Sequence, residues 1–252
     1  SLSGDTQGDV LRSGPFLLGQ HLGFFAGAAF FVCLYRRAWI SAIISVLCIF
    51  YSQSTTAFFG IAAALGIAFL LRPRARVGAA LFAGLIAVGG LAALLPQVRT
   101  LLEFQLQKLG LLEQGNQWAT LSLDIRAVKS EIGFRIMGEN PILGVGPGRF
   151  GVSFFDFAYE YDLPWYYFRA TDRAIAENAY VHVASELGIV ALVAFALAIA
   201  AITLPQYRRS TLFFGLGMYM LIAVSTQSSW TFIPIWVFLG FLASADLENR
   251  SS

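Results

Sequence analysis

The sequence predicts an all-α, polytopic membrane protein with about seven transmembrane helices and one large insert that contains short helices. Of its 252 residues, 57% are hydrophobic and only 13% are charged. That balance is too apolar for an ordinary soluble domain. Several apolar runs approach the ~20 residues that a helix needs to cross the hydrocarbon core of a bilayer. These runs are rich in Leu, Ala, Ile and Phe, which favours helices.

The helices are expected, in chain order, at residues 15–34, 38–51, 57–71, 77–95, 180–204, 212–224 and 232–245. They divide the chain into an N-terminal transmembrane part of about four helices (residues 1–95), a loop domain (residues 96–178) and a C-terminal transmembrane part of about three helices (residues 179–252). The second and third runs are short, so we expect them to be tilted, or partly unwound around the polar SQSTT segment. The chain begins in a polar stretch without Met, from which we expect more membrane helices upstream.

The short loops predict the orientation. Arginines gather in the loops on one side of this arrangement, at Arg36, Arg37, Arg72, Arg74, Arg76, Arg208, Arg209 and Arg250. The short loops on the opposite side, SQSTT and STQSSW, contain no Lys or Arg. Because positively charged short loops stay in the cytoplasm, the large insert is expected outside it. The net charge of +2 is too small to indicate a nucleic-acid partner.

The insert is expected to contain two helices. The first, at residues 101–112, has leucines at helical spacing and is expected to lie along the membrane surface. The second is expected to begin near Ser122, as N-cap, and to end at Gly138, with Asp124 complementing the positive end of its dipole. Its apolar stripe consists of Ile125, Val128, Ile132 and Ile136.

Four cations, Arg126, Lys129, Arg135 and Arg149, surround the glycine-rich segment GVGPGRFG. They predict a clamp for an anionic group such as a pyrophosphate, and the alternative is a solvated helix face. The glycines formally match G-x-G-x-x-G, but a helix and Asn-Pro precede them where a dinucleotide fold needs a strand. We therefore favour a tight turn, and a backbone nest for a phosphate is the alternative.

Carboxylates mark the return of the chain into the membrane. Glu177, Asn178 and Tyr180 stand at the start of the fifth apolar run, and Glu186 lies deeper in it. Desolvation suits a carboxylate at this depth to act as a base. For Glu186, a buried structural partner is an equal alternative. His182 is expected to be a packing or hydrogen-bonding residue.

No metal site is predicted, because nothing has ligand spacing. Cys33 and Cys48 fall inside apolar runs, so no disulfide is expected. The aromatic residues at 154–168 form either an interfacial belt or a surface that stacks on sugar rings, and the sequence leaves both readings open.

At these residues the chain resembles the O-antigen ligase and O-antigen polymerase superfamily of bacterial membrane proteins. The motifs are an Arg-x3-Leu-like start at residues 126–130, N-P-[IL]-x-G-x-G-x-G-x-F at 140–150, [HE]-N-x-Y-[LV] at 177–181 and E-x-G-[IL]-[VI]-[GA] at 186–191. Ser52 and Ser54 match a family S-x-S element, and residues 12–25 match an N-terminal element.

The resemblance implies metal-independent glycosyl transfer at the periplasmic face of the bacterial inner membrane, without a cofactor. The donor would be a glycan on undecaprenyl diphosphate. The acceptor would be another glycan in a polymerase or a lipid A core sugar in a ligase. Arg126 inherits the family role of holding the diphosphate. Ser52 and Ser54, from the S-x-S match, are predicted to bind substrate. The residues singled out by their position and charge are predicted to do the same: Lys129, Arg135, Arg149, Asn178, Tyr180 and Glu186.

The chain departs from the family pattern at three places. Glu177 stands where the ligases have a His that is proposed as the base, and a carboxylate can replace it. Thr55 stands where an Arg is frequent, and Arg149 or Arg12 would substitute for it. Gln20 or His21 stands where the N-terminal element has Asn. These departures favour a polysaccharide polymerase over a ligase, and leave a lipid-linked glycan transporter or a non-catalytic export component as further alternatives.

Overall fold

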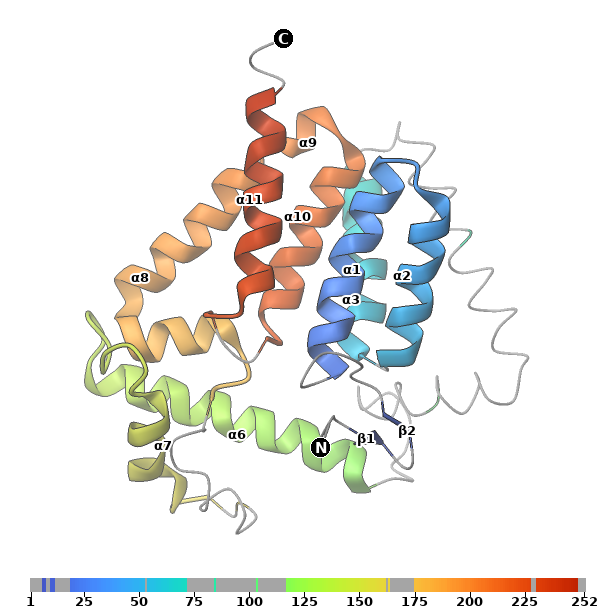
Figure 1. The fold of residues 1–252 in the computed structure, drawn as a ribbon. Helices are drawn as coiled ribbons and strands as arrows, with labels where there is room; N and C mark the ends of the chain where they lie inside the picture. The colour runs from blue at the N-terminus through green and yellow to red at the C-terminus, as the bar shows by residue number, and fades with distance from the viewer. Residues whose placement is uncertain are drawn as a thin grey trace. The chain divides into compact units, whose positions relative to one another are not determined.

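The computed structural model describes residues 6–7, 10–11, 19–52, 54–71, 84, 103, 117–161, 163, 175–227 and 230–248. Figure 1 shows their arrangement into helices, together with one short ribbon of strands β1 (Thr6–Gln7) and β2 (Val10–Leu11). The helices are α1 (Gly19–Tyr35), α2 (Trp39–Ser52), α3 (Thr55–Leu71), α6 (Gln117–Glu139), α7 (Phe150–Ala158), α8 (Ala179–Thr203), α9 (Gln206–Arg209), α10 (Thr211–Val224) and α11 (Ile233–Glu248). In the described part of the chain, the expected all-α class is confirmed.

The contacts divide the chain into two compact units, which are described separately. The bundle unit consists of Ser1–Leu106, Ile199–Ala223 and Pro234–Ser252. The insert unit consists of Gln107–Ala198 and Val224–Ile233. The three-part division expected from the sequence is based on which segments cross the membrane, whereas these two units are based on contacts between residues. The three-part division therefore stays a prediction.

The bundle unit packs around Tyr219 of α10. Its side chain is fully buried, and its hydroxyl donates to the carbonyl oxygens of Gly23 and Phe24 on α1, at 3.3 and 3.2 Å. A Cβ at Gly27 would lie 2.2 Å from that hydroxyl, so only glycine lets the ring approach α1. The Phe31 ring lies 5.8 Å from the Tyr219 ring, which adds an aromatic contact to the same core.

The two ends of the bundle unit differ in chemistry. The rings of Tyr35 and Phe213 lie 4.0 Å apart, and the Tyr207 hydroxyl donates to the Leu71 carbonyl oxygen at 2.7 Å. These contacts bring the C-terminal ends of α1 and α3 to the start of α9 and α10. The turn after α1 and the helix α9 carry Arg36, Arg37, Arg208 and Arg209, so these arginines share one end of the unit. The cytoplasmic location of this end stays a prediction.

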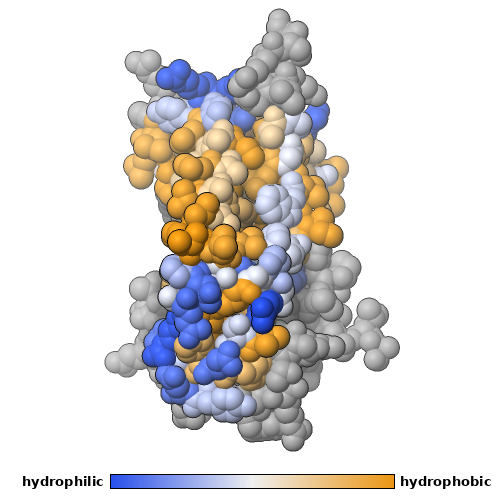
Figure 2. Space-filling view, turned by 90° about the vertical axis from the view of Figure 1, so that its left-hand side faces the viewer, coloured by the Kyte–Doolittle hydropathy of each residue, from blue (hydrophilic) through white to orange (hydrophobic). Residues whose placement is uncertain are grey.

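The expected seven membrane spans are not confirmed. Among the described residues, one stretch, Ala179–Arg209, is long and apolar enough to cross a membrane. The shorter apolar helices are Gly19–Tyr35, Trp39–Ser52, Thr55–Leu71, Thr211–Val224 and Ile233–Ser244. The expected span at 77–95 and the expected surface helix at 101–112 lie outside the described residues, except for residues 84 and 103. Figure 2 shows hydrophobic residues along α8 and hydrophilic residues over α6 and α7.

The insert unit has its own core between α6 and α7. Ile125, Ile132 and Ile136 are buried against Phe150 and Phe154 of α7. The fourth residue of the expected stripe, Val128, is partly buried and packs on the same cluster. The expected stripe is therefore confirmed.

The expected start of α6 at Ser122 is wrong. The helix begins at Gln117 and ends at Glu139, one residue beyond the expected end. In the sequence, Trp118 and Leu121 precede Ile125 by seven and four residues, a spacing that is compatible with a helix that starts before Ser122. Ser122 and Asp124 therefore lie within the helix and do not cap it.

Candidate active site

The start of α8 is built by Asn178. Its side-chain Oδ1 accepts hydrogen bonds from the backbone N–H groups of Tyr180 at 3.1 Å and Val181 at 3.4 Å. Asparagine is a preferred N-cap because it satisfies N–H groups that have no partner inside the helix. Glu177 immediately precedes the cap with a φ of 53°, a left-handed conformation that is uncommon for residues other than glycine. Glu177 therefore lies in the turn that directly precedes the capped end of α8.

Glu177 joins two cations of α6. Its Oε1 lies 2.6 Å from Lys129 Nζ, and its Oε2 lies 3.0 Å from Arg126 Nε. Arg126 and Lys129 are three residues apart and therefore adjacent on the helix surface. The Lys129 side chain is 7% exposed, that of Glu177 is 20% exposed and that of Arg126 is 33% exposed. Two cationic side chains therefore face one carboxylate, and such cations can also bind the oxygens of a phosphate.

Arg135 is engaged elsewhere on α6. Its guanidinium pairs with Glu160 and lies 5.3 Å from the centre of the Tyr161 ring. The Tyr161 hydroxyl donates to Glu131 at 2.8 Å. The hydrogen bond to Glu160 raises the pKa of Arg135, and desolvation followed by the Glu131 hydrogen bond raises the pKa of Tyr161. Of the cations predicted as a clamp, the structure brings Arg126 and Lys129 together and gives Arg135 a separate surface pair.

The glycine-rich segment forms a turn that packs on α8. The backbone N–H of Val145 donates to the Ser185 carbonyl at 3.0 Å, and that of Gly146 donates to the Glu186 carbonyl at 2.8 Å. Gly144 has a φ of 66°, and a Cβ there would lie 2.3 Å from the Glu186 backbone. The prediction of a tight turn, preceded by a helix and not a strand, is confirmed.

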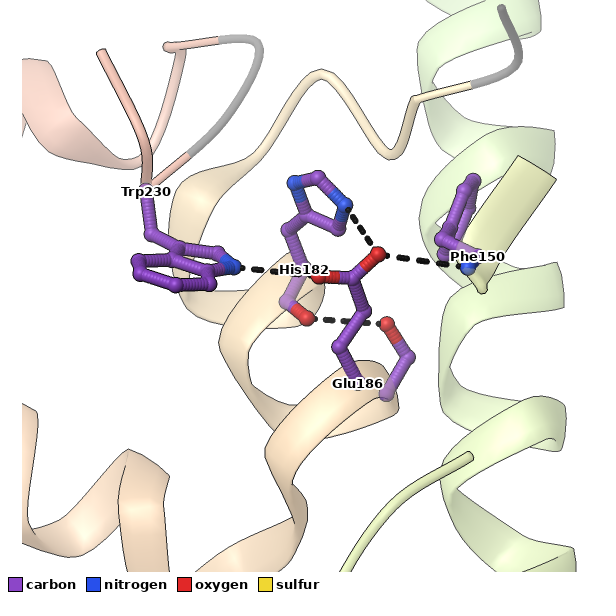
Figure 3. Close-up of polar contacts among 5 residues, drawn as sticks. Phe150, His182, Glu186 and Trp230 are labelled. Carbon is purple, nitrogen blue, oxygen red and sulfur yellow. Dashed lines mark hydrogen bonds and ion pairs between the residues drawn. The ribbon is translucent and has the colours of Figure 1, made fainter. Parts of the chain in front are cut away.

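Glu186 lies at the centre of a buried polar cluster, drawn in Figure 3. It is 3% exposed, and its Oε1 accepts from the backbone N–H of Phe150 at 3.2 Å and lies 3.1 Å from His182 Nε2. Its Oε2 accepts from Trp230 Nε1 at 3.2 Å. Phe150 is the first residue of α7, so the carboxylate occupies the positive end of that helix.

The position of Glu186 bears on whether the glycine-rich segment is only a turn or also a backbone nest for phosphate. An external phosphate would have to displace Glu186 from the α7 N-terminus, so a backbone nest for phosphate is not favoured there. His182 is buried and its ring meets the Phe150 ring edge-on at 5.3 Å, which confirms its expected packing and hydrogen-bonding role.

The family model for O-antigen ligase matches residues 40–196, well over half of the chain. The chain belongs to the O-antigen ligase family. The match covers the α6 cations, the glycine turn and the start of α8, and it confirms the resemblance read from the motifs. A comparison with curated proteins found no match. Members of this family are bacterial inner-membrane proteins that carry out glycosyl transfer of the ligase or polymerase type from lipid-linked glycans.

The serines of the family's S-x-S element lie in the bundle unit and make local bonds. The Ser52 hydroxyl donates to the Ile49 carbonyl at 2.7 Å and accepts from the Ser54 N–H at 3.2 Å. Ser54 Oγ accepts from the Ala57 N–H at 3.4 Å and so caps α3. Their assignment to substrate binding stays a prediction.

The remaining predicted substrate-binding residues differ in accessibility. Arg149 is exposed, and its guanidinium makes no hydrogen bond or ion pair with any residue that the structure describes. The Tyr180 ring packs edge-on against Phe195 at 5.8 Å. Glu186 is buried, and its carboxylate accepts hydrogen bonds from Phe150 and Trp230. Within the described ranges, no group of three His, Cys, Asp or Glu residues is placed to hold a metal ion.

Sequence reasoning missed Trp230 as part of the site's framework. The residue ends the polar STQSSW segment, and its indole N–H reaches Glu186 across 44 positions of the chain. In the sequence, Trp230 was recognisable only as an aromatic residue with an N–H donor at the end of a polar loop. Neither residue spacing nor hydrophobic periodicity relates it to Glu186.

Proposed function

We propose that this member of the O-antigen ligase family is a polysaccharide polymerase. It transfers a glycan from undecaprenyl diphosphate to the sugar hydroxyl of a second glycan, at the periplasmic face and without a metal ion. The supporting observation is the cluster of Arg126, Lys129 and Glu177 at the N-terminal end of the apolar helix α8. A lipid-linked diphosphate presents its charge at such a membrane boundary.

Arg126 and Lys129 would act on the leaving group. When the bond between the anomeric carbon and the diphosphate oxygen breaks, negative charge develops on that oxygen. Cations placed beforehand stabilise this charge, and removal of one such group typically costs about 3 kcal/mol of transition-state stabilisation. The Arg126 side chain is one-third exposed, so a phosphate can approach it.

Glu177 would act on the acceptor. The acceptor hydroxyl oxygen attacks the anomeric carbon, its proton passes to the Glu177 carboxylate, and the diphosphate departs with the bonding electron pair. In the absence of substrate, the carboxylate is paired with both cations. An incoming diphosphate competes for Arg126 and Lys129, which releases the carboxylate to accept a proton. Donor binding and base activation are thereby coupled.

Two sequence features favour a polymerase over a ligase. Glu177 replaces the ligase-type His, and Thr55 replaces an arginine that is frequent in the family. Both changes alter groups that the family uses near donor and acceptor, so we propose a different acceptor from the lipid A core.

The test is complementation of a deletion strain, with analysis of lipid-linked intermediates. A missing polymerase leaves single repeat units, whereas a missing ligase leaves long unattached chains. We expect single units in the deletion strain and in strains that carry Arg126→Ala or Glu177→Gln. Glu160→Gln is the matched control: it removes the same charge from an exposed carboxylate of the insert unit. Long unattached chains in the deletion strain would identify the protein as a ligase, and wild-type polymer from both variants at equal expression would overturn the catalytic proposal.

Two alternative functions would then be tested. Flipping of the lipid-linked unit in liposomes would identify a transporter, and variants that lose only partner binding would identify a scaffold.

A further inference from the structure

The helix α8 is interrupted at Gly188. This residue has a φ of 80° and a ψ of −179°, which no α-helical residue adopts. In a continuous helix, the Ile189 N–H would donate to the Ser185 carbonyl. The interruption therefore frees backbone groups in the middle of an apolar segment. Inside a membrane each unsatisfied group of this kind is costly.

The loop after α6 satisfies the freed groups. Three backbone hydrogen bonds join the two segments: Ile189 N to Pro141 O at 2.8 Å, Val145 N to Ser185 O at 3.0 Å, and Gly146 N to Glu186 O at 2.8 Å. The approach is so close that a Cβ at Gly188 would lie 2.0 Å from the Ile142 carbonyl oxygen. Loop and broken helix thus form one unit, in which the irregular backbone is paired internally.

The same loop presents apolar side chains outward. Ile142 is 63% exposed and Leu143 is 79% exposed, although both are large aliphatic residues. Their backbone lies against Gly188, and the next residues of α8, Ile189 and Val190, are also exposed. The exposed apolar surface continues along the helix at Val193 and Leu197, at helical spacing. A contiguous apolar surface of this kind marks a binding or membrane-contact region.

We propose that residues 141–144 are a wedge inserted into the membrane, in which Ile142 and Leu143 contact lipid hydrocarbon. The occupant is assigned from continuity: the wedge extends the exposed apolar side of the one described stretch that is long enough to span a membrane. Non-helical backbone is tolerated at membrane depth only where protein satisfies it, and the pairing with α8 meets that requirement. Pro141, which has no N–H, removes one donor from the segment.

Spin labels in the full chain test this placement. With Cys33 and Cys48 replaced by Ala, single cysteines are introduced as Leu143→Cys and, as matched control, Glu139→Cys, an exposed polar position at the end of α6. The labelled proteins are reconstituted in vesicles of phosphatidylethanolamine and phosphatidylglycerol. We expect the ratio of oxygen to nickel-chelate accessibility to be several-fold higher at residue 143 than at residue 139.

Two results would overturn the proposal. Equal nickel-chelate accessibility at both positions would place the loop in water. A label at residue 143 that neither reagent reaches would show that another protein surface, such as a second copy of the chain, covers it. If Leu143→Cys fails to fold, the same accessibility ratio is measured for a spin label at Ile142→Cys.

Discussion

Lys129 Nζ lies 2.6 Å from Glu177 Oε1, which ties the middle of α6 to the start of α8 across 48 positions of the chain. The Lys129 side chain is almost completely buried, so this ion pair lies largely away from solvent. The pair therefore serves the fold as well as the proposed chemistry, and the two contributions have to be separated by experiment.

The stability contribution is measured by a double-mutant cycle. Lys129→Met removes one of the two cations that pair with Glu177, and Glu177→Gln removes the carboxylate that both cations share, so we expect each to lower the free energy of unfolding by about 1–3 kcal/mol. The double variant should lose less than the sum of the two single losses, because each single variant already loses the same Lys129–Glu177 interaction. Thermal unfolding in detergent gives the values. Additive losses would show that the two side chains do not interact.

Gly188→Ala tests the broken helix. Alanine at a φ of 80° is strained, and its Cβ would collide with the Ile142 carbonyl. We expect a loss of at least about 1–3 kcal/mol in unfolding free energy. Gly240→Ala in α11 is the control, because no heavy atom lies within 4 Å of that Cβ and alanine favours a helix. Equal stability of the two variants would contradict the described loop–helix contact.

Glu186 is predicted to be a structural residue. Glu186→Gln weakens the acceptor for Phe150 and Trp230, so we expect a loss of about 1–3 kcal/mol in unfolding free energy. Trp230→Phe removes one donor to the same carboxylate and should cost about 1 kcal/mol, less than additively with Glu186→Gln. Chemical denaturation provides the measurement. If Glu186→Gln kept full stability and lost only transfer activity, the residue would instead have to act on substrate.

Arg149 offers the opposite case. Its side chain is exposed, so Arg149→Ala should change the unfolding free energy by no more than about 0.5 kcal/mol. If the guanidinium contacts the donor, KM for the lipid-linked donor should rise about fivefold to tenfold with kcat nearly unchanged. Steady-state kinetics in proteoliposomes separate the two constants, and an unchanged KM would remove Arg149 from the substrate site.

The parts of the fold that follow from local periodicity were predictable. The stripe at Ile125, Ile132 and Ile136 and the ends of most apolar runs follow from side-chain spacing alone. The start of α6 was missed because a plausible cap, Ser122, outweighed the apolar positions before it. A serine inside a helix lowers helix stability only slightly, so a helix can continue through it when apolar residues at helical spacing lie on both sides.

The long-range contacts were not predictable from the sequence. The motifs at Arg126 and Glu177 were recognised separately, but nothing in their spacing relates them as an ion pair. The choice between Lys129 and Arg135 depended on which side of α6 faces α8, and on the pair that Arg135 makes with Glu160. Likewise, Gly188 reads as an ordinary residue of an apolar run until the loop that fills its break is known.

The most direct measurement is the turnover number of purified protein in proteoliposomes with a lipid-linked oligosaccharide as donor and acceptor. If Glu177 accepts the acceptor proton, Glu177→Gln should lower kcat by about 10²–10⁴-fold at an equal amount of folded protein. Glu160→Gln should leave it unchanged. Wild-type turnover from folded Glu177→Gln would contradict the proposed catalytic role of the Arg126–Lys129–Glu177 cluster.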